Sequence, residues 1–178
     1  MTQTATVYGS ALYDLALEQQ QTEAYLSETL LLRKLLAENP RLLQLLCARS
    51  VSLEERKQVL DTCFGGFMPE LRIFMKLLCD KNTAAQLPDC LRQFELRYNA
   101  DHGIMEVTAT SAVALSDSQQ AALQQKLEAK TGKTVRLHCV VDAAVLGGMR
   151  LSMDGQELDG TLRRRLDTLS DELKQLTL

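Results

Sequence analysis

Apolar residues in the first part of the chain recur every three or four positions, which is the spacing of one face of an α-helix. This pattern predicts a first helix from residue 4 to about residue 19, with a wide face of small and apolar side chains. A second helix is predicted to begin at Thr22, whose hydroxyl is a candidate cap, and to end near Asn39-Pro40. The leucines within 42–46 predict a short third helix after this proline.

Three more helices are predicted before residue 103. Ser52, followed by an acidic turn, is the expected cap of the fourth helix, which runs toward Cys63 and is broken by Gly65-Gly66. The fifth helix is expected over 68–79, and the sixth runs from Leu87-Pro88 toward Asp101. Each helix has an apolar stripe that must be buried, so the six are expected to pack as a bundle.

The period of the pattern changes near residue 103, where apolar and polar residues begin to alternate as in a strand. A strand containing Met105 is followed by a helix that Ser116 caps and Thr131-Gly132 ends. Two further strands are predicted over 135–141 and 149–153, separated by Gly147-Gly148. Asp154-Gly155 then indicates a hairpin turn, because type I′ turns need positive φ at both central residues.

The carboxyl-terminal stretch predicts a last helix. It begins near Asp159-Gly160-Thr161, and its leucines step by four and three residues along one helical face. The leucines of this stripe are Leu162, Leu166, Leu169, Leu173 and Leu176. The predicted fold is therefore α+β but mostly α, with a six-helix bundle over 1–103 and a small α+β domain over 104–178.

Composition and charge narrow the functional classes. The net charge is −3 at pH 7, which argues against sequence-independent binding of nucleic acid, since that activity normally requires a basic surface. No apolar run reaches the length of a membrane span, and the first residues lack the features of a secretory signal. We therefore expect no nucleic-acid partner and no direct insertion into a membrane.

The residues that usually carry chemistry show no catalytic, cofactor-binding or metal-binding pattern. The five cysteines are widely spaced and are expected to be reduced and mostly buried. His102 and His138 have no metal-ligand spacing around them. Gly147-Gly148 lacks the surrounding residues of a nucleotide-binding loop and is interpreted as a break between strands.

The carboxyl-terminal block, taken as an ordered set, resembles the signature of the delta subunit of F-type ATP synthases, called OSCP in mitochondria. The shared features are an apolar strand, a short polar break, Gly147-Gly148, a second strand, and Asp159-Gly160-Thr161 followed by a helix with arginines at 163–165. The amino-terminal pattern of Tyr8, Ala11, Leu12 and Tyr13 is also similar to this family.

The resemblance implies a non-catalytic stator subunit of a bacterial-type synthase, without a cofactor, at the cytoplasmic face of the cell membrane. Its helical domain would bind the amino-terminal helix of an alpha subunit of the catalytic head, and its carboxyl-terminal domain would bind the b subunits of the peripheral stalk. The expected alpha-subunit contacts lie on the first and fifth helices: Tyr8, Ala11, Leu12, Leu15, Leu71, Met75 and Leu78. The expected stalk contacts are Arg163, Arg164 and Leu166.

Other interpretations of these residues stay open from the sequence. The apolar positions on the first and fifth helices are equally consistent with a buried core, because a wide apolar face has the same pattern in both cases. The arginines at 163–165 are also consistent with a solvated face that pairs with nearby acids. The alternatives for the whole chain are an unrelated helical adaptor between proteins, and a small enzyme or nucleotide-binding protein that uses Asp159 and the arginines.

Overall fold

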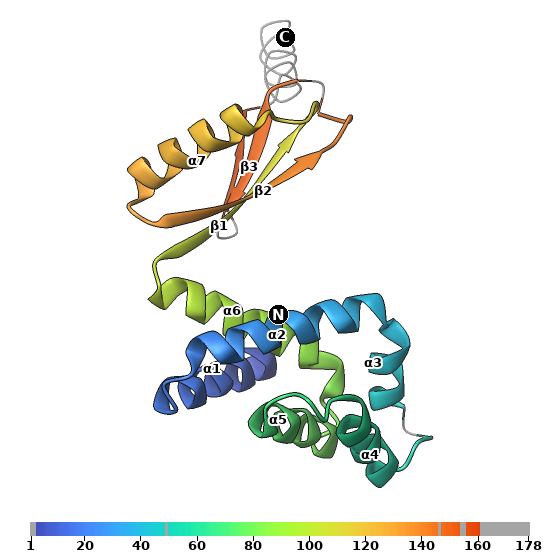
Figure 1. Ribbon diagram of the computed structural model, residues 1–178. Helices are drawn as coiled ribbons and strands as arrows, with labels where there is room; N and C mark the ends of the chain where they lie inside the picture. Colours follow the sequence, from blue (N-terminus) through green and yellow to red (C-terminus); the bar gives the residue numbers. More distant parts are fainter. Residues whose placement is uncertain (1–2, 49, 146, 154–155, 161–178) are drawn as a thin grey trace, which may run out of the picture. The chain divides into compact units, whose positions relative to one another are not determined.

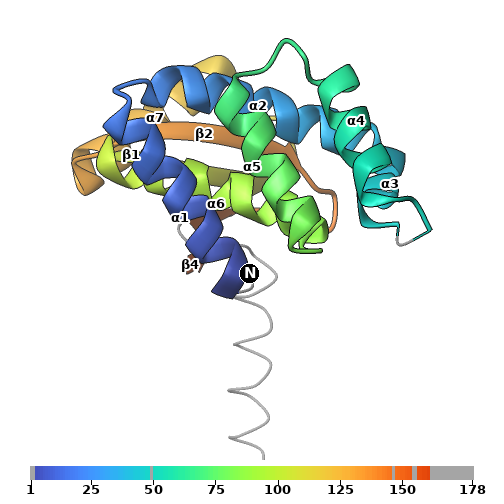
Figure 2. The same ribbon diagram turned by 90° about the horizontal axis from the view of Figure 1, so that it is seen from below.

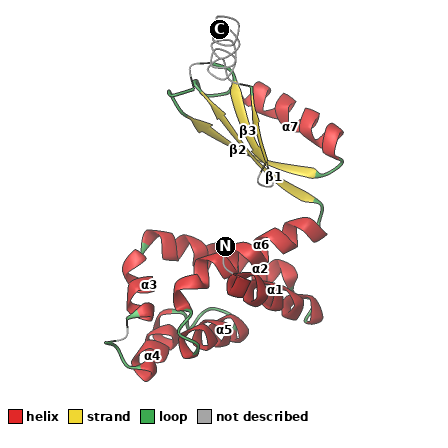
Figure 3. Ribbon diagram, turned by 180° about the vertical axis from the view of Figure 1, so that it is seen from behind, coloured by secondary structure: helices red, strands yellow, loops and turns green. Residues whose placement is uncertain are grey.

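The computed structural model describes residues 3–48, 50–145, 147–153 and 156–160. The chain divides into two compact units, Met1–Asn99 and Ala100–Leu178 (Figure 1). The described part of the first unit is helical, and the second combines a helix with a four-stranded sheet (Figure 3). The predicted class, α+β and mostly α with a helical bundle first, is confirmed.

The helices of the first unit follow the predicted order closely. A 3₁₀ turn, η1 (Ala84–Gln86), precedes the last of them. The α-helices are α1 (Gln3–Glu18), α2 (Thr22–Glu38), α3 (Pro40–Cys47), α4 (Leu53–Cys63), α5 (Pro69–Asp80) and α6 (Leu87–Asp101).

Local capping chemistry explains where α4 begins but not where α2 begins. The Ser52 side chain accepts a hydrogen bond from the Glu55 N–H, and the Glu55 carboxylate accepts from the Ser52 N–H, so α4 has the expected capping box. The predicted cap at Thr22 is wrong. Thr22 is the first helical residue of α2, and Gln21 stands at the N-cap without a side-chain cap bond.

An aromatic trio lies in the core of the helical bundle. The rings of Tyr13 in α1 and Phe94 in α6 are 5.4 Å apart in an edge-on arrangement, and Tyr25 of α2 stacks on Phe94 at 6.4 Å. All three side chains are fully buried. Because aromatic side chains bury large apolar areas, this trio holds α1, α2 and α6 together.

The second unit is built on a mixed sheet with the strand order β2-β1-β3-β4. The central strand β1 (Ile104–Ser111) pairs in parallel with β2 (Thr134–Val141) and antiparallel with β3 (Met149–Met153). The edge strand β4 (Gln156–Asp159) pairs with β3, which confirms the predicted hairpin around residues 154–155. Those two turn residues lie outside the described part of the chain, as does the predicted helix after Gly160.

The helix α7 (Asp117–Thr131) connects the two parallel strands and lies along one face of the sheet (Figures 1 and 3). Ser116 caps it with a capping box, and Gly132 ends it in the left-handed conformation with φ of 68°, as predicted. Leu127 of α7 packs with Val107 and Val135 to form the core of the unit.

The alternation along β2 predicts that every second residue is buried, and the structure shows this for only part of the strand. Val135 is buried and Leu137 is half-buried, but Cys139 and Val141 are exposed. The apolar residues that α7 contributes to this core are Leu123, next to the middle of the helix, and Leu127, in the half that leads into the start of β2. Within the described part of the chain, the far end of this edge strand therefore has less apolar cover than its start.

Candidate partner-binding surfaces

The helix α1 presents a mixed face of small and apolar side chains to solvent. Ala11 is exposed, while Tyr8 and Leu15 are half-buried. Leu12, which was also expected at the partner surface, is 2% exposed and lies in the core. In the perpendicular views of Figures 1 and 2, α1 and α5 are neighbouring helices.

A glycine allows α1 to approach α6 closely. A Cβ atom at Gly9 would lie 2.5 Å from the carbonyl oxygen of Cys90 and 2.6 Å from the Cβ of Gln93, which is closer than non-bonded atoms approach. The Arg97 guanidinium of α6 adds a contact over the Tyr13 ring, 5.4 Å from its centroid, and also pairs with Asp14. The outer face of α1 is therefore held in a fixed position on α6.

On α5 the three residues expected to contact a partner are core residues. Leu71, Met75 and Leu78 are each no more than 1% exposed, so they lie on no surface of this conformation. The apolar side chains that α5 does expose are Ile73, at 64%, and Leu77, at 38%. The sequence-based prediction did not include these two residues. Their positions outside the dominant apolar stripe of the helix were a signal that they are exposed.

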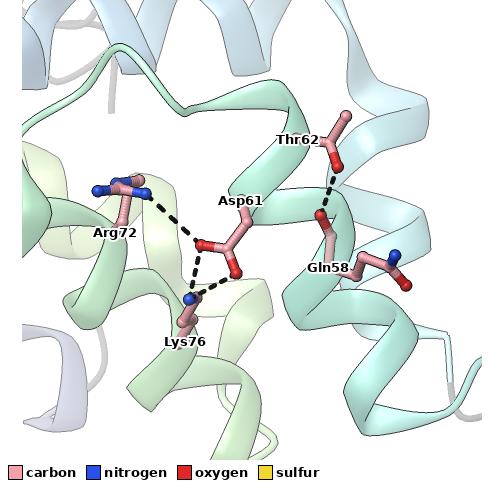
Figure 4. Close-up of polar contacts among 5 residues, drawn as sticks. All are labelled: Gln58, Asp61, Thr62, Arg72 and Lys76. Carbon is pink, nitrogen blue, oxygen red and sulfur yellow. Dashed lines mark hydrogen bonds and ion pairs between the residues drawn. The ribbon is translucent and has the colours of Figure 1, made fainter.

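Ion pairs hold α4 against α5 (Figure 4). The Asp61 carboxylate of α4 lies 2.6 Å from the Lys76 ammonium and 3.6 Å from the Arg72 guanidinium, both on α5. Lys57 pairs with Asp80 at 2.8 Å farther along the two helices. The buried residues of α4 are Arg56 and Leu60. The ion pairs are partly exposed and contribute little stability by themselves, so their main effect is to orient α4 on α5.

The start of α5 lies in an acidic environment. The carboxylate of Glu28 in α2 accepts a hydrogen bond from the Met68 N–H at 2.8 Å. Burial, together with the charges of Glu70 and Glu28, raises the pKa of the neighbouring Tyr25 phenol to about 12. Tyr25 is therefore a neutral hydrogen-bond donor, and its hydroxyl donates to Gln19 Oε1 at 2.8 Å.

The predicted stalk contacts Arg163, Arg164 and Leu166 lie outside the described residues. Within the described part of the second unit, several valines at the carboxyl ends of β1 and β2 are exposed. Val113 is 74% exposed, and Val140 and Val141 are 47% and 56% exposed. Because β1 and β2 are parallel, these residues gather at one end of the sheet.

The cysteines differ from the sequence-based expectation in their burial. Cys79 and Cys90 are buried, but Cys47, Cys63 and Cys139 are exposed, and all five are free thiols. Burial, together with the charge of Asp89, raises the pKa of the Cys90 thiol to about 11. Among residues 3–48, 50–145, 147–153 and 156–160, no cluster of three metal-ligating side chains occurs. No helix in those same ranges is long and apolar enough to cross a membrane.

The sequence model of the family described as ATP synthase delta (OSCP) subunit matches this chain over residues 4–173. The chain belongs to this family. Delta (OSCP) subunits are components of the stator, the peripheral stalk of ATP synthase, so the family prediction and the stator prediction are confirmed. Membership in the family also removes the support for an unrelated adaptor.

Curated delta subunits from bacteria are similar to this chain over nearly their whole length. The ATP synthase subunit delta of Lactiplantibacillus plantarum is 31% identical over 166 residues, which is 93% of this chain and 92% of the relative. That of Exiguobacterium sibiricum is also 31% identical over 166 residues, covering 93% of this chain and 94% of the relative.

A solved structure shares the delta (OSCP) fold with this chain. A chain in the cryo-EM structure of the Toxoplasma gondii mitochondrial ATP synthase hexamer superposes with a TM-score of 0.81 at 19% sequence identity. The superposition covers 97% of this chain and 98% of that chain. At this level of identity the comparison shows that the two chains have the same fold.

Proposed function

We propose that the helical unit binds the amino-terminal helix of an alpha subunit of the catalytic head, along the neighbouring helices α1 and α5. The carboxyl-terminal unit binds the b subunits of the peripheral stalk. The chain is then a non-catalytic link at the cytoplasmic face of the membrane, and the reaction chemistry and proton passage belong to other subunits. Membership in the delta (OSCP) family supports this role.

One observation carries the alpha-subunit proposal: α1 and α5 are neighbours, and each exposes small or apolar side chains from a rigidly held helix. Ala11 of α1 leaves room for an approaching backbone, and Ile73 and Leu77 of α5 offer apolar surface. An amphipathic helix that lies on such a surface buries its apolar face. We therefore assign Tyr8, Ala11 and Leu15 of α1 and Ile73 and Leu77 of α5 to the partner surface.

This arrangement suits a stator. The head experiences torque while the central rotor turns, and the link must not dissociate on the time scale of catalysis. Affinity differences between related interfaces arise mainly in the dissociation rate, so a large apolar contact provides the slow dissociation that the role needs.

The proposal is tested by placing a charge at Ala11. Ala11→Asp introduces a carboxylate into the surface that the partner helix would bury, and we expect binding to the catalytic head to weaken by at least about tenfold. Ala121→Asp is the matched control, because Ala121 is an exposed alanine within α7 of the other unit. Equal head binding by the two folded variants would contradict the proposed surface on α1.

A further inference from the structure

The helix α5 lacks a capping side chain of its own. Its N-cap residue is Met68, which has no side-chain hydrogen bond to the helix, and Pro69 follows at the first position. In a capping box, the residue at the third helical position accepts a hydrogen bond from the N-cap N–H. In α5 this position is Leu71, a core residue that has no acceptor in its side chain.

Glu28 supplies the missing acceptor from another helix. Its Oε2 atom accepts from the Met68 N–H at 2.8 Å, across 40 residues of sequence. In α4 the same bond is local, since the Ser52 N–H donates to Glu55 Oε2 at 3.0 Å. A carboxylate at this place also interacts favourably with the positive end of the helix dipole. Glu28 of α2 therefore caps the start of α5 from another helix.

Asp61 holds α5 from a second direction. Its carboxylate contacts Lys76 and Arg72, which are four residues apart and so lie on one face of α5 (Figure 4). Ile73 and Leu77 each follow one of these cations directly in the sequence. When α5 is turned about its axis so that Arg72 and Lys76 both contact Asp61, Ile73 and Leu77 are exposed.

We propose that Glu28 and Asp61 are positioning residues for the partner surface on α5. Glu28 fixes the start of the helix, Asp61 fixes its rotation about its axis, and neither side chain needs to touch the partner. This inference rests on the proposed function, because it concerns the same surface. Without these contacts the first turns of α5 open more often, and a partner helix must order them when it binds.

The test uses the full chain and a synthetic peptide of an alpha-subunit amino-terminal helix. Glu28→Ala should weaken peptide binding about five- to tenfold, the size of effect expected from loss of a helix cap. Glu28→Gln keeps an acceptor oxygen and should bind within about twofold of the wild type. Asp61→Asn should weaken binding about two- to threefold, and it serves as the main variant if Glu28→Ala does not fold.

A charge control separates positioning from a general effect of net charge. Glu38→Ala makes the same change on α2 at an exposed residue, whose ion pair with Lys34, at 3.9 Å, is within its own helix. It should bind the peptide as the wild type does. A purely structural role for Glu28 would lower the unfolding temperature of Glu28→Ala and leave the affinity of the folded protein unchanged.

Amide hydrogen exchange gives a readout that needs no partner. Glu28→Ala should accelerate exchange at Met68, whose N–H donates to Glu28, and at Arg72, whose N–H donates to the Met68 carbonyl in the first turn of α5, whereas Glu38→Ala should not. Wild-type affinity in folded Glu28→Ala and Asp61→Asn would overturn the positioning role, as would equal losses in Glu38→Ala. If the wild type itself does not bind the peptide, the proposed function fails; unchanged exchange at these amides would then overturn the role of Glu28 separately.

Discussion

Gly9 lies where α1 and α6 approach closely, and the packing of the two helices leaves no room for a side chain at this position. Gly9→Ala would place a Cβ atom 2.5 Å from the backbone oxygen of Cys90, which cannot move without shifting α6. We expect the free energy of unfolding to fall by about 1–3 kcal/mol, the usual effect of overpacking a core.

Gly66→Ala is the control for this prediction. A Cβ atom at Gly66 would meet nothing within 4 Å, so this variant should unfold at nearly the wild-type denaturant concentration. Urea unfolding of both variants makes the comparison. Equal midpoints for Gly9→Ala and the wild type would mean that α1 does not pack on α6 as described.

The cap of α4 gives a second prediction at the scale of single residues. Ser52→Ala removes the hydroxyl that accepts from the Glu55 N–H, and we expect a loss of about 1 kcal/mol in stability at neutral pH. Thr22→Ala should cost little, because the Thr22 side chain does not cap α2. Thermal unfolding of the two variants tests this contrast.

The same cap predicts a pH dependence. Hydrogen bonds from the Ser52 hydroxyl and N–H lower the pKa of Glu55 below its usual value. A carboxyl group whose pKa is lowered by folding stabilises the native state above its unfolded pKa, and that contribution is lost as the pH falls through the folded value. The stability difference between the wild type and Ser52→Ala should therefore shrink in acid, and the pKa of Glu55, followed by NMR, should rise in the variant.

Caps of this kind were predictable from the sequence because their partners lie within four residues. Ser52 and Ser116 were both correctly identified as caps, and in the structure the residue three positions after each, Glu55 or Gln119, completes a capping box. Glu28 could not be identified in this way. Its partner is the N–H of Met68 on another helix, 40 residues away, so no pattern of neighbouring residues in the sequence predicts this contact.

At the scale of elements, the pair of Arg33 and Glu95 joins α2 to α6. The Glu95 side chain is only 8% exposed, whereas that of Arg33 is 43% exposed. Arg33→Met leaves a buried carboxylate without its cation, and we expect a destabilisation of about 2 kcal/mol, reduced from fully buried cases by the exposure of the arginine.

A second substitution should repair this loss. Arg33→Met combined with Glu95→Gln removes the unpaired charge and should recover part of the stability, which a double-mutant cycle in urea measures. A double variant no more stable than Arg33→Met alone would show that the arginine acts through packing of its aliphatic chain rather than through the ion pair.

The order and ends of the helices followed from periodicity, but the outward face of each helix did not. The first and fifth helices carry apolar residues over a wide arc, and this arc includes both the core row with Leu12 and Leu71 and the surface residue Ile73. Only the packing of neighbouring helices decides which side is covered. The same reason explains the far end of β2, where the apolar and polar residues still alternate but the apolar ones are exposed among the described residues.

At the scale of the whole molecule, the sequence was sufficient to assign both the class of the fold and the family. The decisive signal was a set of strands, glycines and a hairpin in fixed order, which constrains backbone geometry more tightly than any single motif does. The partner-binding residues were harder to predict from the sequence, because they depend on which side chains remain exposed after the helices pack.

The central claim is that the helical unit holds the catalytic head through an amphipathic helix laid on α1 and α5. The most direct test is a calorimetric titration of the full chain with a peptide of an alpha-subunit amino-terminal helix. The account predicts tight one-to-one binding with a negative heat-capacity change, the mark of apolar burial. Absence of binding to the peptide and to the isolated catalytic head would contradict it.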